Sequence, residues 1–304
     1  MKRVIGVLSL AFFLVPVCMF ATAEGHFDKT LQVSGSVNLD LTTGSGEVQI
    51  RTSSSNQVVI HGTVRSSNWW GGGDAEAAVR SVESNPPIEQ SGNSIRVGYN
   101  LPEDAKHHVS IAYEVTVPAD TALAVNTGSG DISVEGVRSS AKLHTGSGGI
   151  RARDLGPQSR METGSGSIRA DSVAAPMYAN TGSGSITGDL TGSGDVEVHT
   201  GSGGIDIRGV SGGLRARTGS GHIAVDGAVK GPWQLHAGSG SVRMALNSGG
   251  SGFDLNVHTG SGSIHSDLPI TVQGTFGRHE LKGSVRGGGP EVEVSTGSGD
   301  VEIR

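Results

Sequence analysis

Apolar and polar residues alternate in short runs over most of this chain, and Gly-rich tetrapeptides separate one run from the next. Alternation with period two is typical of β-strands that bury one face and expose the other. One set of apolar positions follows the tetrapeptides: Ile132 and Val134, Ile150 and Ala152, Ile168 and Ala170, Ile205 and Ile207, Ile223 and Val225, and Val242 and Met244. A second set precedes them: Leu143, Met161, Tyr178, Val198, Leu214, Ala216, Leu235, Leu255 and Val257. The pattern predicts two strands per repeat, with these side chains pointing inward.

The Gly-rich tetrapeptides are copies of Thr-Gly-Ser-Gly with regular spacing. They begin at Thr43, Thr127, Thr145, Thr163, Thr181, Thr191, Thr200, Thr218, Thr259 and Thr296, with an Ala-Gly-Ser-Gly variant at Ala237. From Thr127 to Ala237, the main series advances by 18 or 19 residues per copy. Units too small to bury a face alone must stack on their neighbours. We therefore predict an all-β fold, a parallel β-solenoid with about 18 residues per rung, TGSG corners and an irregular N-terminal β cap.

The corner residues have expected roles of their own. Parity places the Thr of each copy on the inward side, because it lies two residues after inward positions such as Leu143 and Val198. We expect these threonines to stack inside the corner with their hydroxyl groups hydrogen-bonded to the backbone. We expect the glycines to supply the positive φ of a tight corner, which Gly adopts without a Cβ clash.

The chain begins with the features of a secretory signal peptide. Lys2 and Arg3 precede an apolar run, and the segment Ala21-Thr22-Ala23 supplies the small residues of a cleavage site. The single cysteine, Cys18, lies within this leader, so the exported chain is expected to fold without disulfides. We expect an exported protein located in the periplasm, in the cell envelope or outside the cell.

Three segments follow from these patterns. Residues 1–23 are the predicted signal peptide, residues 24–120 an N-terminal β-rich capping segment, and residues 121–304 the TGSG-repeat β-solenoid. The capping segment contains one short helical candidate, Asp74–Glu83. Atypical terminal units are expected in a solenoid because they block edge-to-edge association.

The segment from Tyr113 to Gly136, YEVTVPADTALAVNTGSGDISVEG, resembles a family of bacterial envelope proteins labelled "putative adhesin", a β-strand-repeat domain of unknown function. The likeness covers most of the predicted mature chain: an N-terminal β segment, a strand ending in Val-Pro, and rungs that contain Gly-Ser-Gly. The resemblance implies a β-solenoid at or outside the membrane and implies no established catalytic residues. This chain departs from the ordinary pattern in the uniformity of its TGSG corners.

Composition and charge narrow the classes of function. The chain has 304 residues with 50 Gly but only 6 Phe, 3 Tyr and 3 Trp, so large rings cannot dominate its core. A formal charge of −6 argues against a nucleic-acid partner, since no basic surplus is available to neutralise phosphates. The long apolar run lies in the leader, and we expect no transmembrane segment in the mature chain. The oligomeric state is left open.

Two metal sites were considered and neither is predicted. Calcium-binding β-rolls carry Asp at the sixth position of a nine-residue repeat, but that position is apolar here: Ile132, Ile150, Ile168, Ile186, Val196, Ile205, Ile223, Val242 and Ile264. Histidines precede four corners, namely His144, His199, His236 and His258. Arg217 separates His199 from His236, so even with His236 next to His258 no three follow one another, whereas zinc needs three or four close ligands. We predict no metal and no cofactor.

A serine hydrolase site is also not predicted. Gly209–Gly213 matches the G-x-S-x-G pattern, and Asp226 and His236 follow in the order of an α/β-hydrolase. That motif requires a strand that runs into a helix, whereas Leu214–Arg217 reads as the next strand. We therefore predict no catalytic residues and no enzymatic activity.

The outward charges are candidates for binding. Asp171 and Asp189 are expected to face outward on adjacent rungs, about 5 Å apart. Such a pair binds a cation or acts as acid and base on a sugar, as in solenoid polysaccharide lyases and hydrolases. The favoured alternative is a solvated charge ladder in which Arg153 and Arg208 offset neighbouring acids such as Asp226.

Two adjacent aromatic residues, Trp69 and Trp70, complete the binding-surface candidates, which are Trp69, Trp70, Asp171, Asp189, Arg208 and Asp226. As an exposed tip, the tryptophans stack on sugars or enter a membrane interface. The favoured alternative is burial against the cap, because Trp is usually well buried.

The leading functional hypothesis is a non-enzymatic, secreted or envelope-associated β-solenoid that acts as a scaffold or adhesin-like binding surface. An envelope polysaccharide or an envelope protein is the expected partner. The alternative is a carbohydrate-active solenoid enzyme that uses outward acids such as Asp171 and Asp189. Ice binding ranks last, because it uses outward Thr arrays and parity places these threonines inward.

Overall fold

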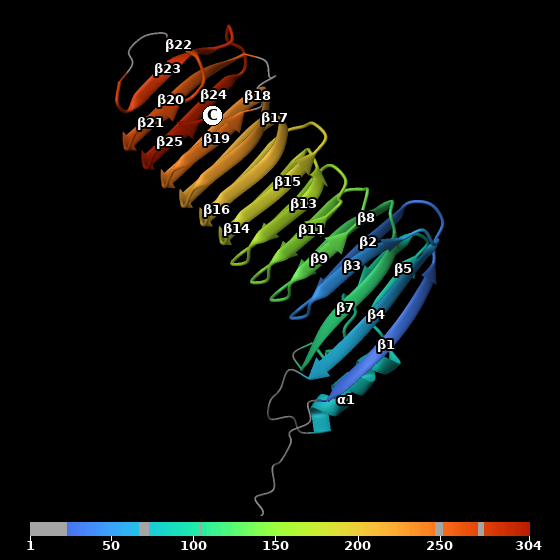
Figure 1. The fold of residues 1–304 in the computed structure, drawn as a ribbon. Helices are drawn as coiled ribbons and strands as arrows, with labels where there is room; N and C mark the ends of the chain where they lie inside the picture. Colours follow the sequence, from blue (N-terminus) through green and yellow to red (C-terminus); the bar gives the residue numbers. More distant parts are fainter. Residues whose placement is uncertain (1–22, 67–72, 104, 107, 247–251, 273–276) are drawn as a thin grey trace, which may run out of the picture.

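The computed structural model describes residues 23–66, 73–103, 105–106, 108–246, 252–272 and 277–304. Over these residues the chain is mostly β, with one helix and a single large mixed sheet of 25 strands, most of whose pairings are parallel. Figure 1 shows the strands stacked side by side along one axis. The predicted signal peptide lies outside the described residues except for Ala23, and β1 begins at Glu24.

The elements fall into three regions along the chain. The first contains β1 (Glu24–Gln32), β2 (Val37–Thr43), β3 (Val48–Ser53), β4 (Gln57–Ser66), α1 (Gly73–Ser84), β5 (Ile88–Ser91), β6 (Ser94–Val97) and β7 (Val109–Pro118). The second contains β8 (Thr121–Thr127), β9 (Ile132–Glu135), β10 (Ala141–Thr145), β11 (Ile150–Arg153), β12 (Ser159–Thr163), β13 (Ile168–Ala174), β14 (Met177–Ser183), β15 (Ile186–Thr191), β16 (Val196–Ser202), β17 (Ile205–Ser220), β18 (Ile223–Ser239) and β19 (Val242–Leu246). The third contains β20 (Phe253–Ser261), β21 (Ile264–Ser266), β22 (Ile270–Val272), β23 (Glu280–Val285), β24 (Glu291–Ser298) and β25 (Val301–Ile303).

Strand pairing in the middle region is parallel, and partner residues lie 18 or 19 positions apart except at register shifts between β13 and β15 and between β17 and β18. Leu143 on β10 pairs with Val125 on β8 and Met161 on β12, each 18 positions away. Ile150 on β11 pairs with Ile132 on β9 and Ile168 on β13 in the same way. Identical repeat positions therefore stand in columns that run along the stack.

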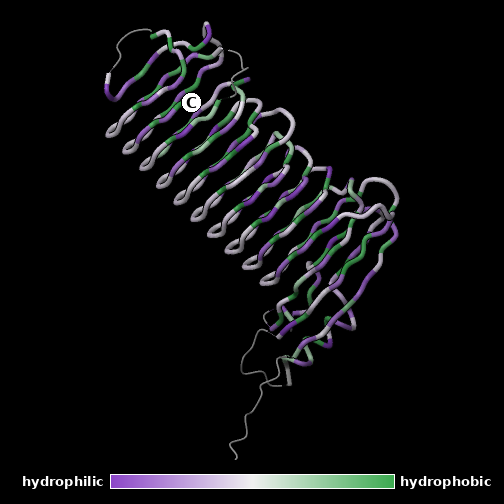
Figure 2. Tube along the Cα trace, in the orientation of Figure 1, coloured by the Kyte–Doolittle hydropathy of each residue, from purple (hydrophilic) through white to green (hydrophobic). Residues whose placement is uncertain are grey.

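The predicted alternation sets the core. Residues such as Ile150, Ala152 and Leu143 are at most 2% exposed, and Figure 2 shows apolar and polar residues alternating along the strands beside a pale row of corners. One member of the predicted inward set is wrong. Tyr178 pairs with Arg160 on the outward side, while its neighbour Ala179 pairs with Met161 and is fully buried.

The corner threonines form a hydrogen-bonded ladder, as the parity argument predicts. Thr163 Oγ1 donates to Gly148 O at 2.7 Å and accepts from Gly166 N at 3.1 Å. Thr145 repeats both contacts one turn earlier, with Gly130 O at 2.9 Å and Gly148 N at 3.0 Å. Thr145 and Thr163 therefore close their own corners and join them to the corners before, and other threonines, such as Thr181 and Thr218, make the bond to the preceding corner. Thr43 bonds Ile111 O instead, and the side chain of Thr191 is exposed.

The two glycines of a corner have different reasons. The last glycine of several corners adopts positive φ, as expected: Gly203, Gly221, Gly240, Gly262 and Gly299. The first glycine of a corner, such as Gly146, does not. A Cβ at Gly146 would lie 2.4 Å from the carbonyl oxygen of Gly128 in the preceding corner, so glycine is required there because successive corners stack backbone against backbone.

The N-terminal region closes one end of the stack. β2 and β3 pair in parallel with β8 and β9, with Thr43 aligned to Thr127, so residues 37–53 continue the repeat. Beyond them, β7 pairs with β3, β4 lies antiparallel to β7 and β1 antiparallel to β4. Helix α1 confirms the helical candidate and contacts β1, β4 and β7. The described start of the chain is thus covered by antiparallel strands and a helix.

The C-terminal region does not follow chain order. β24 pairs in parallel with β18 on one side and with β20 on the other, and β25 lies between β19 and β21 in the second layer. The segment Glu291–Ile303 is therefore inserted between two turns that precede it in sequence. Antiparallel β23 and β22 then continue the sheet beyond β20.

Replacing a ladder threonine should destabilise the protein. Thr163→Val keeps the shape but leaves Gly148 O and Gly166 N without their hydroxyl partner, so we expect a loss of about 1–3 kcal/mol in unfolding free energy. Denaturant or thermal unfolding measures it. The matched control is Thr191→Val at an exposed corner, where stability should stay within about 0.5 kcal/mol. Equal stability of Thr163→Val and the wild type would contradict the ladder.

Adding a methyl group at a stacked corner should also destabilise the fold. In Gly146→Ala, the new Cβ meets the Gly128 carbonyl at 2.4 Å, and we expect a loss of about 1–3 kcal/mol or more. Gly44→Ala is the matched control, because Gly44 holds the same place in the first corner and nothing lies within 4 Å of its Cβ position. The two melting temperatures should differ clearly, and a similar drop in both variants would refute backbone stacking as the reason for glycine.

Candidate functional site

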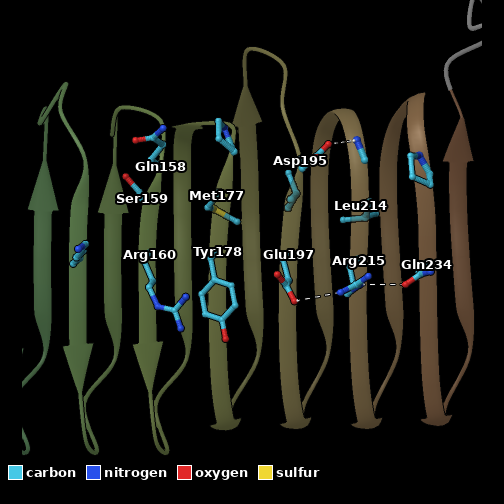
Figure 3. Close-up of a pocket in the computed structure, with 15 residues that line it drawn as sticks. Gln158, Ser159, Arg160, Met177, Tyr178, Asp195, Glu197, Leu214, Arg215 and Gln234 are labelled. Atoms are coloured by element: carbon cyan, nitrogen blue, oxygen red, sulfur yellow. Dashed lines mark hydrogen bonds and ion pairs between the residues drawn. The ribbon is translucent and has the colours of Figure 1, made fainter.

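A groove of about 560 Å³ lies on the outward face of the layer that contains β12, β14, β16, β17 and β18 (Figure 3). Its lining residues come mostly from the outward positions of these strands. They are Lys142, Gln158, Ser159, Arg160, Pro176, Met177, Tyr178, Asp195, Val196, Glu197, Gly213, Leu214, Arg215, Pro232 and Gln234.

The centre of the groove is a single column of register partners. Five residues on five neighbouring strands follow one another in it, in the order Arg160, Tyr178, Glu197, Arg215 and Gln234. Parallel strands lie about 4.8 Å apart, so the column spans about 19 Å along the stack. The constant register of the repeat therefore places different functional groups at equal steps.

Tyr178 is the aromatic residue of this column. The guanidinium carbon of Arg160 lies 3.8 Å from the centroid of the Tyr178 ring, a cation–π contact. The Arg160 guanidinium also bonds Glu162 at 2.6 Å, and this bond raises the pKa of Arg160. The ring of His199 stands on the other strand neighbour, with its centroid 6.2 Å from that of Tyr178. The Tyr178 side chain is thus half-buried, with Arg160 on one side of its ring and His199 on the other.

Glu197 is neutralised within the site. Its Oε1 lies 2.8 Å from His199 Nε2 and 4.0 Å from Arg215 Nη1. The hydrogen bond from His199 lowers the pKa of Glu197, and the nearby positive charges act in the same direction. Arg215 Nε in turn donates to Gln234 Oε1 at 3.2 Å (Figure 3). This half of the groove is an internally satisfied polar network.

The other half of the groove is more basic. Lys142 is the register partner of Arg160, so two cations stand on adjacent strands. Lys142 has no ion pair with any residue that the structure describes. The carboxylate of Asp195 is occupied, because its Oδ1 accepts a hydrogen bond from Gly213 N at 2.9 Å.

The predicted outward acids meet on the opposite layer. Asp171 and Asp189 are register partners on β13 and β15 and line a hollow of about 290 Å³ with Arg208. Each has its own arginine: Arg169 Nε lies 2.8 Å from Asp171 Oδ2, and Arg208 Nη1 lies 3.8 Å from Asp189 Oδ1. The arrangement is a charge ladder in which two adjacent acids each have an arginine partner.

Three predicted residues stand apart from this ladder. Asp226 pairs with Ala245 and does not line the hollow. Trp69 and Trp70 lie outside the described residues.

The histidine column is rearranged by the inserted C-terminal segment. Ser295 on β24 lies between His236 and His258, and His236 Nδ1 is 2.8 Å from Ser295 Oγ. The expectation that His236 and His258 are neighbours is therefore wrong. Among the described residues, no three His, Cys, Asp or Glu side chains form a group able to hold a metal ion.

The groove over Tyr178 was missed at the sequence level because Tyr178 had been assigned to the wrong face. The signal was present, since Tyr178 stands three residues before Thr181, as Arg160 stands three residues before Thr163. Position relative to the corner threonine therefore identifies the outward face for Tyr178, whereas the hydrophobic character of its side chain suggests the inward face.

The charge state of Glu197 provides a test of the network. Removal of the imidazole in His199→Ala deletes the bond that stabilises the carboxylate, so the pKa of Glu197 should rise toward its ordinary 4.5. Carboxyl titration by NMR measures the change. His258→Ala, on a strand that does not line the groove, should leave the pKa of Glu197 as it is. A fall, or no change, in the His199 variant would contradict the assigned partner.

The sequence and the structure were compared with those of known proteins. No curated protein matches the chain. The crystal structure of a "putative cell adhesion protein" from Clostridium sporogenes is 13% identical, with 92% of this chain and 98% of that chain covered at a TM-score of 0.28. That of a "putative adhesin" from Bacteroides fragilis is 12% identical, with 92% and 97% covered at a TM-score of 0.35.

The family model gives the assignment. The model described as Toastrack DUF4097 matches residues 89–304, well over half of the chain. This match includes the segment from Tyr113 to Gly136 that resembles the "putative adhesin" family, and it confirms that resemblance. The chain belongs to the toastrack DUF4097 family.

Proposed function

We propose that this protein is an exported, envelope-associated β-solenoid that acts as a non-enzymatic scaffold with an adhesin-like binding surface. The observation that carries the proposal is the groove of about 560 Å³, whose central column takes one outward residue from each of five neighbouring strands. A surface built in equal steps suits a partner that is itself extended, such as an envelope polysaccharide or a strand-like segment of an envelope protein.

The constant register supports the solenoid with about 18 residues per rung and TGSG corners. Partners such as Leu143 and Met161, or Ile150 and Ile168, are 18 positions apart in both layers. The threonine ladder joins successive corners and makes the stack one continuous body. A rigid body of this kind presents a long face without requiring the ligand to order it, which lowers the entropy cost of binding.

The proposed location rests on the leader and on where the fold begins. Residues 1–23 have the charged start, apolar run and small-residue cleavage site of an exported protein. Among the described residues, which begin at Ala23, the first strand starts at Glu24, directly after that site. In the part of the chain that the structure describes, no helix is both long enough and apolar enough to cross a bilayer.

The competing function is a carbohydrate-active enzyme, and one observation favours it. Asp171 and Asp189 stand on adjacent strands and share a hollow, the arrangement in which an acid and a base act on a sugar. Against it, each carboxylate is already paired with an arginine. We therefore propose the binding role.

Co-sedimentation separates the two functions. Purified protein from Glu24 onward is mixed with the envelope fraction of the producing cells, and the pellet is assayed for protein and the supernatant for released sugar. We expect pelleting without sugar release, unchanged in Asp189→Asn. Sugar release that disappears in Asp189→Asn would establish the enzyme instead, and absence from the pellet would refute an envelope-binding surface.

A further inference from the structure

We propose that the groove over Tyr178 binds an acidic glycan, with a sugar ring against the tyrosine and the sugar carboxylate between Lys142 and Arg160. The inference rests on the proposed function, in which this face is the binding surface, and it names the ligand class. It concerns the groove alone and not the charge ladder of the opposite layer.

The apolar and hydrogen-bonding groups of the groove suit a sugar ring. Tyr178 contributes a flat apolar ring with a hydroxyl group at its tip, a combination common where a ligand is partly apolar and partly wet. Pro176 and Pro232 add apolar surface without backbone N–H groups, and Gln158 and Gln234 supply amide donors and acceptors. A pyranose has the matching surfaces, because its C–H face is apolar and its rim carries hydroxyl groups.

The charges of the groove favour an acidic ligand. Its lining carries three cations, Lys142, Arg160 and Arg215, against the two carboxylates of Asp195 and Glu197. Glu197 is held by His199 and Arg215, and Asp195 accepts a hydrogen bond from Gly213 N. The cations Lys142 and Arg160 have fewer partners within the protein.

Lys142 has no ion pair among the described residues, and the printed contacts of Arg160 are the bond of its Nη2 to Glu162 and the stacking on Tyr178. The Arg160 guanidinium carries five donor N–H groups in all, so donors remain for a ligand.

The register of the two cations points to the same end of the groove. Lys142 and Arg160 are direct register partners, so the two cationic side chains leave neighbouring strands at the same position. An anion placed between them accepts hydrogen bonds from both. A carboxylate is such an anion, and the adjacent Tyr178 then receives the ring that carries it.

The direction of the groove sets the shape of the ligand. The column from Arg160 to Gln234 crosses the strands, so a bound chain lies along the stack and meets a new side chain about every 4.8 Å. Beyond Tyr178 it encounters Glu197, Arg215 and Gln234, whose remaining donors and acceptors face hydroxyl groups. An oligosaccharide with acidic residues fits this order better than a single sugar does.

Binding to three polymers tests the ligand class. The probes are polygalacturonate, its uncharged methyl ester, and polyglutamate, which carries carboxylates without sugar rings. With the protein from Glu24 onward, we expect polygalacturonate to bind at least about tenfold more tightly than either of the other two, because only it offers both the ring and the charge. Equal binding of polyglutamate would show simple charge attraction and overturn the proposal, and so would equal binding of the methyl ester.

Two matched pairs of variants locate the site. Tyr178→Ala should weaken polygalacturonate binding about tenfold, whereas Tyr99→Ala should not. Tyr99 is a fair control, because it also stacks with an arginine, Arg96 at 4.2 Å, but lies outside the groove. Lys142→Gln should weaken binding severalfold, while Lys282→Gln, which removes the same charge from an exposed position of β23, should leave it unchanged. Thermal melting of each variant checks that the fold is intact.

The envelope assay keeps this inference separate from the proposed function. If Tyr178→Ala melts as the wild type does but pellets with envelope less well, the groove is the binding site and the proposal stands. If wild type and Tyr178→Ala pellet equally while polygalacturonate fails to bind, the protein remains an envelope-binding scaffold and the acidic-glycan site is refuted. If the wild type does not pellet at all, the proposed function fails, and tight binding of polygalacturonate by the wild type would then still support the site.

Discussion

The hydrogen bond from corner threonines such as Thr145 and Thr163 to the carbonyl of the neighbouring corner is the constraint on which the rest of this structure depends. It fixes the height of one turn above the next, because the hydroxyl reaches only to a backbone that stacks in contact. That contact in turn leaves no room for a Cβ at positions such as Gly146. Threonine and glycine therefore act together: glycine lets the backbones of neighbouring corners come into contact, and the threonine hydroxyl bonds across that contact. The outward side chains of neighbouring turns therefore stand at even steps of about 4.8 Å along the stack.

Much of this architecture could be predicted from the sequence because the repeat is local and uniform. Period-two alternation gave the strands, and counting from the corner gave the buried face of Thr163 and its equivalents. Tyr178 was misplaced because a large ring in a strand suggests burial, whereas register with Arg160 decides its side. The pairing of His236 with Ser295 instead of His258 was not predictable, since identical repeats carry no local mark of which neighbour they will meet. The groove could not be predicted from the sequence, because Tyr178 lines it only when its side chain lies on the outward face.

The two layers put the same scaffold to different electrostatic use. On one layer, Asp171 and Asp189 lie on neighbouring strands and each has an arginine partner, so that the charges are balanced in pairs. On the other, the balance is uneven: Glu197 is held by two partners while Lys142 lacks an ion pair among the described residues. Exposed ion pairs contribute little to stability, so neither pattern is needed to hold the fold. The difference lies in what each face offers to a ligand, a neutral ladder on one side and a graded groove on the other.

The inserted segment Glu291–Ile303 has a consequence for how the molecule is made. During synthesis from the N-terminus, each strand from β10 to β19 finds a partner strand that is already made, about one repeat earlier in the chain. The turn formed by β20 and β21 does not, because its partner strands β24 and β25 are translated later. Residues 253–266 must therefore wait, with an open strand edge, until their support arrives from downstream. We therefore expect strands to be added one after another along the middle of the stack. The C-terminal turns can be completed only when β24 and β25, the last strands made, insert between β18 and β20 and between β19 and β21.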